Sequence, residues 1–135
     1  MPDDIAPAPH EPPTIQHFLP TRLGPKPWGE ELLVAHTQHY TGKVLTMRAG
    51  TSGPLQYHRT KDETFHLWQG KARVYFASSD GRLFSVVMES GESYHVPPGA
   101  VHRVEAITKC VFFEASTPVF DDRVAVTAAA YTQIP

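Results

Sequence analysis

Cysteine is almost missing from this 135-residue chain, which has a single one, Cys110. One cysteine cannot form a disulfide within the chain, and the absence of a Cys-x-x-Cys motif removes the thiolate set of a structural zinc or an iron–sulfur cluster. Any metal bound by this chain must therefore use histidine, carboxylate or amide ligands.

Basic charge and long apolar runs are also lacking. The chain has 12 Lys and Arg against 14 Asp and Glu, which gives a formal charge of −2. Binding to a phosphate backbone needs a basic excess, so we expect no nucleic-acid partner. No apolar run approaches the ~20 residues of a membrane span, and the acidic, proline-broken start is unlike a signal peptide. We therefore expect no membrane partner and a cytoplasmic location.

The prolines are unevenly distributed and suggest where the domain begins. Eight of the 13 prolines lie in residues 1–27, a segment without helical or strand periodicity. Because proline removes a backbone donor, we expect this segment to be an arm that sustains no ladder of hydrogen bonds. Disorder, docking across the domain and docking across a neighbouring subunit stay open as alternatives for this arm. The length suits one domain. We therefore predict a proline-rich arm at 1–27, one β-barrel domain at 28–126 and a tail at 127–135.

The segment 31–116 consists of short runs rich in Val, Leu, Phe, Tyr and Thr, separated by clusters of Gly, Pro, Ser and Asp. These runs predict nine strands, at 32–36, 43–48, 55–58, 64–68, 72–78, 83–89, 93–96, 101–107 and 110–115. The pair Asp80-Gly81 is typical of a tight hairpin turn. Strands at this spacing, with almost no helical period, predict an all-β sandwich or a small barrel such as a jelly roll. Only the tail, at 125–131, has a weak helical pattern, and a final strand or a loose end are equal alternatives for it.

Four polar residues stand out among these strands. Gln56 and His58 are two positions apart, so their side chains point to the same face of one strand. Glu63 begins the next strand and shares a face with Phe65, which brings Glu63 to the same site if that face is the barrel interior. His102 is the first inward position after a Pro-Pro-Gly turn.

The spacing of these residues resembles the two sequence motifs of the cupin family. The second family motif, G-x5-P-x-G-x2-H, is matched in spacing by Gly91, Pro97, Gly99 and His102. The first motif, in which H-x-H is followed by Glu and then Gly, is matched at His58, Glu63 and Gly70. The resemblance covers residues 24–126 and implies an all-β double-stranded β-helix, the jelly-roll cupin barrel of two antiparallel sheets.

Two positions depart from the family motifs, and one of them narrows the resemblance. Ala106 replaces the closing Asn of the second motif, and Gln56 stands where the first His is usual. A Gln-x-His pair followed by Glu and a distant His is similar to the ligand set of the mannose-6-phosphate isomerase branch. Other segments similar to that branch are Lys26-Pro-Trp-Gly-Glu30, Leu55-Gln-Tyr-His58, His102-Arg103, Glu114-Ala-Ser-Thr-Pro118 and Asp121-Asp-Arg123.

The resemblance implies one divalent metal ion in the mouth of the barrel. The ligands would be Gln56, His58, Glu63 and His102. Two imidazoles, a carboxylate and an amide oxygen suit zinc, which is our first expectation, and also manganese, nickel or iron. Four protein ligands leave a coordination position for water or substrate. The alternative is a metal-free barrel in which these polar groups satisfy one another.

Other residues are candidates for substrate contacts or proton transfer. Arg59, Lys61 and Arg103 form a basic group near the predicted mouth, suited to a phosphate or carboxylate on a ligand. The alternative is a solvated rim of charges. His95, which approaches the Pro-Pro-Gly turn, is the candidate catalytic base, whereas His66 has the wrong parity for the site.

These observations predict a metal-binding cupin that is a sugar or sugar-phosphate isomerase, in which the ion polarises a carbonyl and its neighbouring hydroxyl. Two alternatives stay open because a fold does not determine function. One is an iron-dependent dioxygenase, or a lyase or epimerase, acting on a small carboxylate. The other is a non-catalytic metal- or sugar-binding module. The expected partners are a small anionic or polyhydroxylated molecule and a second copy in a homodimer that covers exposed sheet edges.

Overall fold

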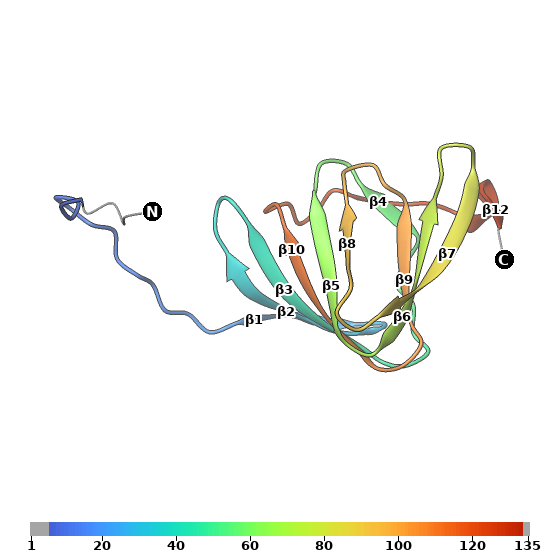
Figure 1. Ribbon diagram of the computed structural model, residues 1–135, viewed down its shortest axis with the longest axis horizontal. Coiled ribbons are helices and arrows are strands. Elements are labelled where there is room, and N and C mark those ends of the chain that lie inside the picture. Colours follow the sequence, from blue (N-terminus) through green and yellow to red (C-terminus); the bar gives the residue numbers. More distant parts are fainter. Residues whose placement is uncertain (1–5, 134–135) are drawn as a thin grey trace.

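The computed structural model describes residues 6–133, which form two six-stranded sheets and one short helical turn. Figure 1 shows the two sheets enclosing the interior of a barrel. We call them sheet I, with strand order β1-β2-β3-β10-β5-β8, and sheet II, with order β11-β4-β9-β6-β7-β12. The predicted all-β jelly-roll cupin barrel is confirmed. Residues 1–5 of the predicted arm and 134–135 of the predicted tail lie outside the described residues.

Neighbouring strands are antiparallel, except that β12 pairs with β7 in parallel. Sheet I consists of β1 (Thr21–Lys26), β2 (Gly29–His36), β3 (Thr41–Met47), β10 (Cys110–Ser116), β5 (Glu63–Gln69) and β8 (Ser93–Val96). Sheet II consists of β11 (Arg123–Ala125), β4 (Gln56–His58), β9 (His102–Ala106), β6 (Lys71–Ala77), β7 (Arg82–Glu89) and β12 (Thr132–Gln133). All nine predicted strands are present, within a few residues of their expected ends.

The side-chain alternation of β5 explains how the core and the candidate site share one interior. Glu63, Phe65 and Leu67 are buried, as the period of two predicts. His66 points to the opposite face, where its Nδ1 lies 2.8 Å from Ser93 Oγ. Phe65 and Leu67 belong to the apolar core, whereas Glu63 lies at the polar end of the same row. One strand therefore contributes both to the core and to the candidate site.

A glycine holds the turn between β5 and β6 close to β10. Gly70 has a φ of +109°, and a Cβ built on it would lie 2.3 Å from the Lys109 carbonyl oxygen. Any larger residue would push the start of β10 away, because this neighbour is backbone and cannot move aside. Gly70 therefore keeps the end of β5 close to the start of β10, at the opposite end of these two strands from Glu63.

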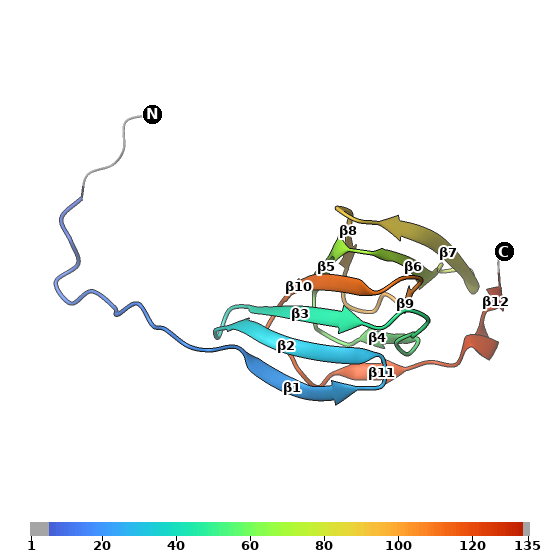
Figure 2. The ribbon, with the colours of Figure 1, turned by 90° about the horizontal axis from the view of Figure 1, so that it is seen from below.

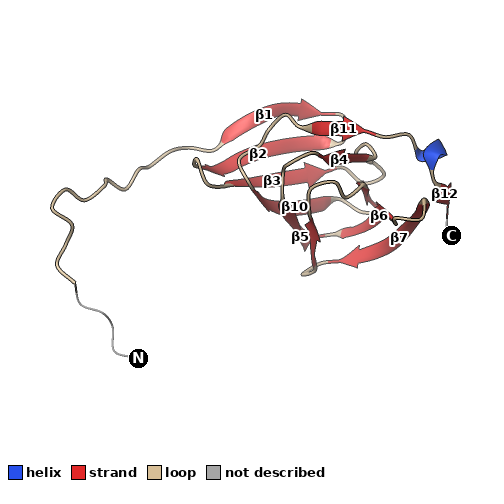
Figure 3. Cartoon of the chain, turned by 90° about the horizontal axis from the view of Figure 1, so that it is seen from above, coloured by secondary structure: helices blue, strands red, loops and turns tan. Residues whose placement is uncertain are grey.

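The prediction that residues 1–27 sustain no ladder is wrong for Thr21–Lys26, which form β1 and pair with β2. Pro25 is tolerated there because β1 is an edge strand and the register shifts between Arg22 and Pro25. Gly24, with a φ of +74°, lies within this irregularity. Residues 6–20 form no strand, are exposed throughout, and run away from the barrel (Figures 2 and 3).

The C-terminal segment pairs with sheet II on both sides of a short helical turn. Before the tail, β11 pairs with β4, and after it β12 pairs with β7. Between them, the helical pattern of the tail gives only a 3-10 turn, Ala128–Ala130, which is capped by Thr127 (Figure 3). Among residues 6–133, no helix has the length and apolar character needed to cross a membrane.

Candidate metal centre

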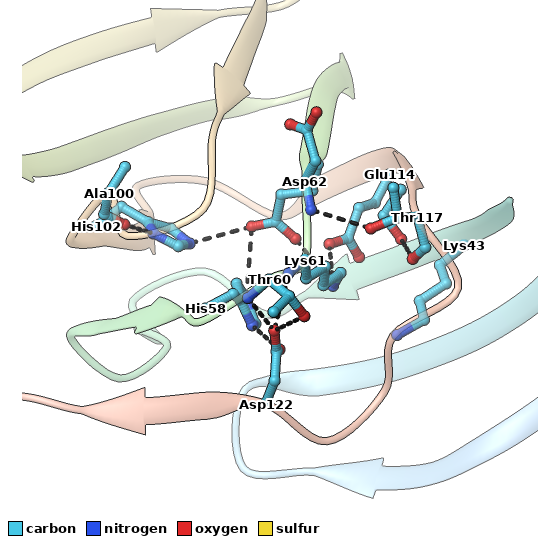
Figure 4. Close-up of polar contacts among 12 residues, drawn as sticks. Lys43, His58, Thr60, Lys61, Asp62, Ala100, His102, Glu114, Thr117 and Asp122 are labelled. Carbon is cyan, nitrogen blue, oxygen red and sulfur yellow. Dashed lines mark hydrogen bonds and ion pairs between the residues drawn. The ribbon is translucent and has the colours of Figure 1, made fainter.

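Three strand ends bring His58, Glu63 and His102 together inside the barrel (Figure 4 shows the two histidines). His58 ends β4, Glu63 begins β5 and His102 begins β9. Glu63 Oε1 lies 3.2 Å from His102 Nε2 and 3.7 Å from His58 Nε2. One ligand atom from each of the three residues lies within 4.8 Å of the other two, and all three side chains are buried.

The outer nitrogen of each imidazole has its own acceptor. His102 Nδ1 donates to the carbonyl oxygen of Ala100 at 2.9 Å, and His58 Nδ1 lies 3.1 Å from Asp122 Oδ1 (Figure 4). A carbonyl or carboxylate oxygen can only accept, so each neutral ring carries its proton on Nδ1. In this neutral form both Nε2 lone pairs point toward Glu63, whereas a protonated His102 ring donates from both nitrogens, to Glu63 and to the Ala100 carbonyl.

The electrostatic surroundings act differently on the two histidines. Burial lowers the pKa of His58, and the carboxylate of Glu63 only partly opposes this effect. Burial acts in the same direction on His102, but its hydrogen bonds to Glu63 and to the Ala100 carbonyl raise its pKa above the ordinary value. Proton binding at the centre is therefore favoured on the His102 side.

Asp122 is a residue of the site that sequence reasoning did not single out. Its Oδ2 accepts hydrogen bonds from the backbone N–H of Thr60 at 2.6 Å, the backbone N–H of Lys61 at 2.8 Å and the Thr60 hydroxyl at 3.0 Å. Burial opposes ionisation, but these donors and His58 lower the pKa of Asp122 to about 2. The carboxylate thus stays ionised and fastens the loop after β4 to His58.

A buried ionic cluster adjoins the centre. Lys61 Nζ lies 2.9 Å from Glu63 Oε2 and 2.8 Å from Glu114 Oε1 (Figure 4). Burial alone would lower the pKa of Lys61, but the two carboxylates raise it. Burial would raise the pKa of Glu63, but its hydrogen bonds and the charge of Lys61 lower this pKa below its ordinary value. Burial and the neighbouring Glu63 raise the pKa of Glu114 to about 7. Glu114, which sequence reasoning also missed, is therefore the more easily protonated carboxyl group.

Gln56 lies next to His102 in the register between β4 and β9. Its side-chain oxygen Oε1 is buried without a hydrogen-bond partner. A buried acceptor without a partner costs about 1–3 kcal/mol, so native proteins rarely keep one unless it binds a ligand or an ion. Gln56 thus offers a free oxygen in the wall of the cavity that His58, Glu63 and His102 also line.

These residues open onto a cavity of about 440 Å³. Its opposite wall comes from β2 and β3, where Glu31 lies 2.8 Å from Lys43 Nζ and 3.4 Å from Lys26 Nζ. Lys43 Nζ also lies 5.1 Å from the centre of the Phe120 ring. Burial opposes ionisation of Glu31, but the two lysines lower its pKa. The cavity is therefore polar and charged at both ends.

Glu31→Gln is expected to destabilise the fold by roughly 3 kcal/mol at neutral pH, because it leaves buried Lys43 without its counter-charge. The pKa of Glu31 is lower in the folded chain than its ordinary value of 4.5. Its carboxylate therefore stabilises the fold above pH 4.5 and loses this effect as the pH falls through the folded-state pKa. Urea unfolding across this pH range should show the gap between wild type and variant closing.

The matched control is Glu30→Gln on the same strand, because Glu30 pairs with Arg22 at the exposed surface. An exposed pair contributes about 0–1 kcal/mol, so this variant should differ little from wild type at any of these pH values. Equal losses in the two variants would contradict the assigned burial and charge of Glu31.

The remaining predicted site residues separate into two groups. Lys61 and Arg103 line the cavity, although the Arg103 guanidinium lies 4.2 Å from the centre of the Tyr75 ring and its Nε is buried without a partner. Arg59 and His95 do not line it. His95 is exposed, and its Nε2 lies 2.6 Å from Asp62 Oδ1. The structure therefore brings two of the three predicted basic residues to the cavity and leaves the candidate base outside.

Comparison with protein families gives a match over most of the barrel. The family model described as "Cupin domain" matches residues 43–115, from β3 to β10. Asp122 lies beyond the matched segment. A curated relative, Germin-like protein subfamily 3 member 2 of Arabidopsis thaliana, is 34% identical over 56 residues, which are 42% of this chain and 25% of the plant protein.

Comparison with solved structures shows the same fold at low identity. The capsular polysaccharide assembling protein CapF of Staphylococcus aureus has a TM-score of 0.71 and 18% identity over 82% of this chain and 32% of its own. Oxalate decarboxylase of Bacillus subtilis has a TM-score of 0.68 and 17% identity, over 79% and 30%. KdgF of Halomonas sp. has a TM-score of 0.66 and 18% identity, over 76% and 91%. This chain thus spans about a third of the first two proteins and a quarter of the plant relative.

Proposed function

This chain belongs to the cupin family, and from that premise we propose that it holds one divalent metal ion beside its cavity and binds a small anionic or polyhydroxylated molecule there. The proposed ligands of the ion are Gln56, His58, Glu63 and His102. The observation that carries the proposal is the convergence of His58, Glu63 and His102, whose ligand atoms lie within 4.8 Å of one another.

The chemistry of the donor set fits such an ion. Ligand atoms bound to one ion at about 2.0–2.2 Å lie roughly 3–4 Å apart, and the separations of 3.2 and 3.7 Å around Glu63 Oε1 fall in this range. In their neutral form both imidazoles direct an unprotonated Nε2 toward Glu63, because Ala100 and Asp122 accept from Nδ1. The unpartnered Oε1 of Gln56 supports its place as the fourth ligand.

Nitrogen and oxygen ligands of this kind suit zinc, manganese, iron and nickel. Zinc is the ion we propose first. A solved structure of Bacillus subtilis oxalate decarboxylase is described by its Mn(II) centres, which makes manganese the next candidate. When bound, an ion of this group supplies a Lewis acid that polarises a carbonyl or hydroxyl oxygen of a ligand.

The chain's own charges favour an anionic ligand. The cavity is lined by five basic side chains, Lys26, Lys43, Lys61, Arg103 and Arg123, and by four acidic ones, Glu31, Glu63, Glu114 and Asp121. A divalent cation would add two positive charges to this nearly balanced set. A phosphate or carboxylate would therefore be drawn into the cavity.

We propose isomerisation of a sugar or sugar phosphate as the first candidate reaction, supported by the Gln-x-His, Glu and His ligand pattern. Chemistry on a small carboxylate, by an iron-dependent dioxygenase, a lyase or an epimerase, is the second candidate, supported by the cationic balance of the cavity. A binding module without turnover is the third. The three candidates share the metal and the cavity and differ in what happens to the bound molecule.

A binding panel tests the proposed function. The chain, loaded with one equivalent of zinc or manganese, is titrated calorimetrically with a hexose phosphate, the neutral hexose and a small dicarboxylate. We expect an anion to bind in a metal-dependent way and the neutral hexose to bind more weakly. Aldose–ketose interconversion, or release of product from the carboxylate, then separates the two enzyme candidates from a binding module. Equal affinities with and without metal would contradict the proposal.

Asp122→Asn is expected to weaken metal affinity about 10- to 100-fold. The carboxylate orients His58 through Nδ1 at 3.1 Å and holds the loop of Thr60 and Lys61, and an amide lacks the charge for both tasks. Competition with a chelating dye measures the affinity, and ¹⁵N NMR of the His58 ring reports whether the Nδ1–H tautomer is kept.

The control for this variant is Asp121→Asn, which removes a neighbouring charge that lines the cavity without contacting His58. We expect it to leave the His58 tautomer unchanged and to weaken the metal by less than Asp122→Asn does. If the two variants behaved alike, Asp122 would act only through its charge and not by positioning His58.

A further inference from the structure

The outer face of sheet I is apolar where β3, β10 and β5 run side by side. Phe113 is in register with Val44 on one side and His66 on the other. Trp68 is 72% exposed on this face. An apolar groove crosses the face, and its lining includes Val44, His66, Trp68, Val111 and Phe113.

Strand β10 shows why this face is unusual. Phe112 and Glu114 are buried toward the interior, while Val111, Phe113 and Ala115 point outward. A sheet with one solvated face normally alternates apolar and polar residues, so a central strand that is apolar on both faces indicates a covered sheet.

Sheet II follows the normal rule on its outer face. There, Arg73, Tyr75, Arg103 and Glu105 lie together in the register of β6 and β9, and the Tyr75 hydroxyl donates to Glu105. The apolar outer surface is therefore a property of sheet I and not of the barrel as a whole.

The N-terminal arm carries exposed apolar side chains of the kind that can cover such a face. Residues 6–20 lead directly into β1, an edge strand of sheet I, and they run away from the barrel (Figures 1 and 2). Three apolar side chains in this segment are exposed: Ile15 at 97%, Leu19 at 78% and Phe18 at 56%. The chain therefore leaves both its own apolar arm and its own apolar sheet face uncovered.

We propose that a second copy of this chain covers that face, with the arm segment 15–19 of each copy lying across the groove of its partner. Each copy has one arm and one face on the same sheet, so a two-fold arrangement buries both pairs with a single type of contact. This proposal is independent of the metal, and it moves the homodimer predicted from sheet edges to the face of sheet I.

The dimensions fit this arrangement. Segment 15–19 begins six residues before β1, and six extended residues reach up to about 20 Å. Six strands spaced by about 4.8 Å make sheet I roughly 24 Å wide from β1 to β8. Segment 15–19 therefore reaches the groove of a partner when the two sheet faces pack directly against each other, and the PPII-type backbone favoured by its prolines loses little entropy on docking.

Sedimentation of the full chain is the first test. We expect wild type to be a dimer, and we expect Trp68→Asp and Leu19→Asp, made separately, each to weaken the dimer at least about tenfold. Both residues are exposed, so neither change should affect folding. Val87→Asp, at an exposed apolar residue on the outer face of sheet II, is the control and should leave the dimer intact. A monomeric wild type, or a dimer insensitive to both variants, would overturn the proposal.

Cross-linking between two different variants tests which segments meet. Leu19→Cys and Trp68→Cys are prepared separately, mixed and oxidised, while the native Cys110 stays buried and unreactive. Because each copy carries only one of the two new thiols, a 19–68 disulfide found by mass spectrometry must join two copies. Replacing Trp68→Cys by Val87→Cys should abolish the product. Absence of the 19–68 link, or an equal yield with Val87→Cys, would show that the arm does not lie on this face.

Discussion

His102→Ala is expected to reduce bound metal from near one ion per chain to near zero. The variant removes one of the two imidazole ligands and the group that lies 3.2 Å from Glu63 Oε1. It also removes the ring that Ala100 orients. Two of the remaining donors are His58 Nε2 and Glu63 Oε1, which lie 3.7 Å apart. Without the second imidazole these donors form a much weaker site. Elemental analysis by mass spectrometry, on protein purified without an affinity-metal column, measures the change.

The control is His95→Ala, which removes an exposed histidine that pairs with Asp62 and does not line the cavity. We expect its metal content to equal that of wild type. Unchanged metal in His102→Ala, or the same loss in both variants, would show that the ion binds elsewhere on the chain.

Lys61→Met is expected to destabilise the metal-free fold by about 3–5 kcal/mol, because removing one partner of a buried ion pair leaves uncompensated charge. In this chain Lys61 stands between two buried carboxylates, at 2.9 Å from Glu63 and 2.8 Å from Glu114. Methionine keeps most of the side-chain volume, so the loss reports on charge and not on a cavity. Urea unfolding without metal measures it and separates stability from metal binding.

Lys71→Met provides the comparison, because Lys71 pairs with Glu89 at the surface, where both side chains are about half exposed. An exposed pair of this kind contributes about 0–1 kcal/mol. If Lys61→Met lowered the free energy of unfolding as little as Lys71→Met, the cluster of Lys61, Glu63 and Glu114 would be solvated. That result would contradict the burial described above.

The sequence predicts that the four proposed ligands lie close together, because their placement is local. Two positions on one strand share a face, so Gln56 and His58 had to lie together, and the parity of β5 put Glu63 on the same side as Phe65 and Leu67. The turn before β9 placed His102 at a strand start. These deductions need only the period of a strand and the position of a turn.

Sequence reasoning missed Glu114 and Asp122 because they approach the proposed ligands from distant segments of the chain. Glu114 meets Lys61 only through the register of β10 with β5, which pairs Ser116 with Glu63. Asp122 reaches His58 across 64 positions of sequence. Neither residue belongs to a local pattern, so no periodicity could identify it.

The surroundings of Lys61 and the strand β1 escaped sequence reasoning for a related reason. A lysine in this loop suits either a ligand contact or a solvated rim, but Asp122 binds the backbone N–H of Lys61 and the side chain turns inward to two carboxylates. The proline-rich composition hid β1, whose pairing tolerates Pro25 only because the strand lies at an edge and carries an irregularity. In both cases the tertiary environment outweighed local propensity.

Anomalous diffraction at the absorption edge of the metal found by elemental analysis tests the central claim most directly. Crystals of the full chain, purified without an affinity-metal column, should show one anomalous peak within bonding distance of His58 Nε2, Glu63 and His102 Nε2, with Gln56 Oε1 as a further ligand. A map with no peak among these residues, or with its only peak at another position, would contradict the assignment of this site as a metal centre.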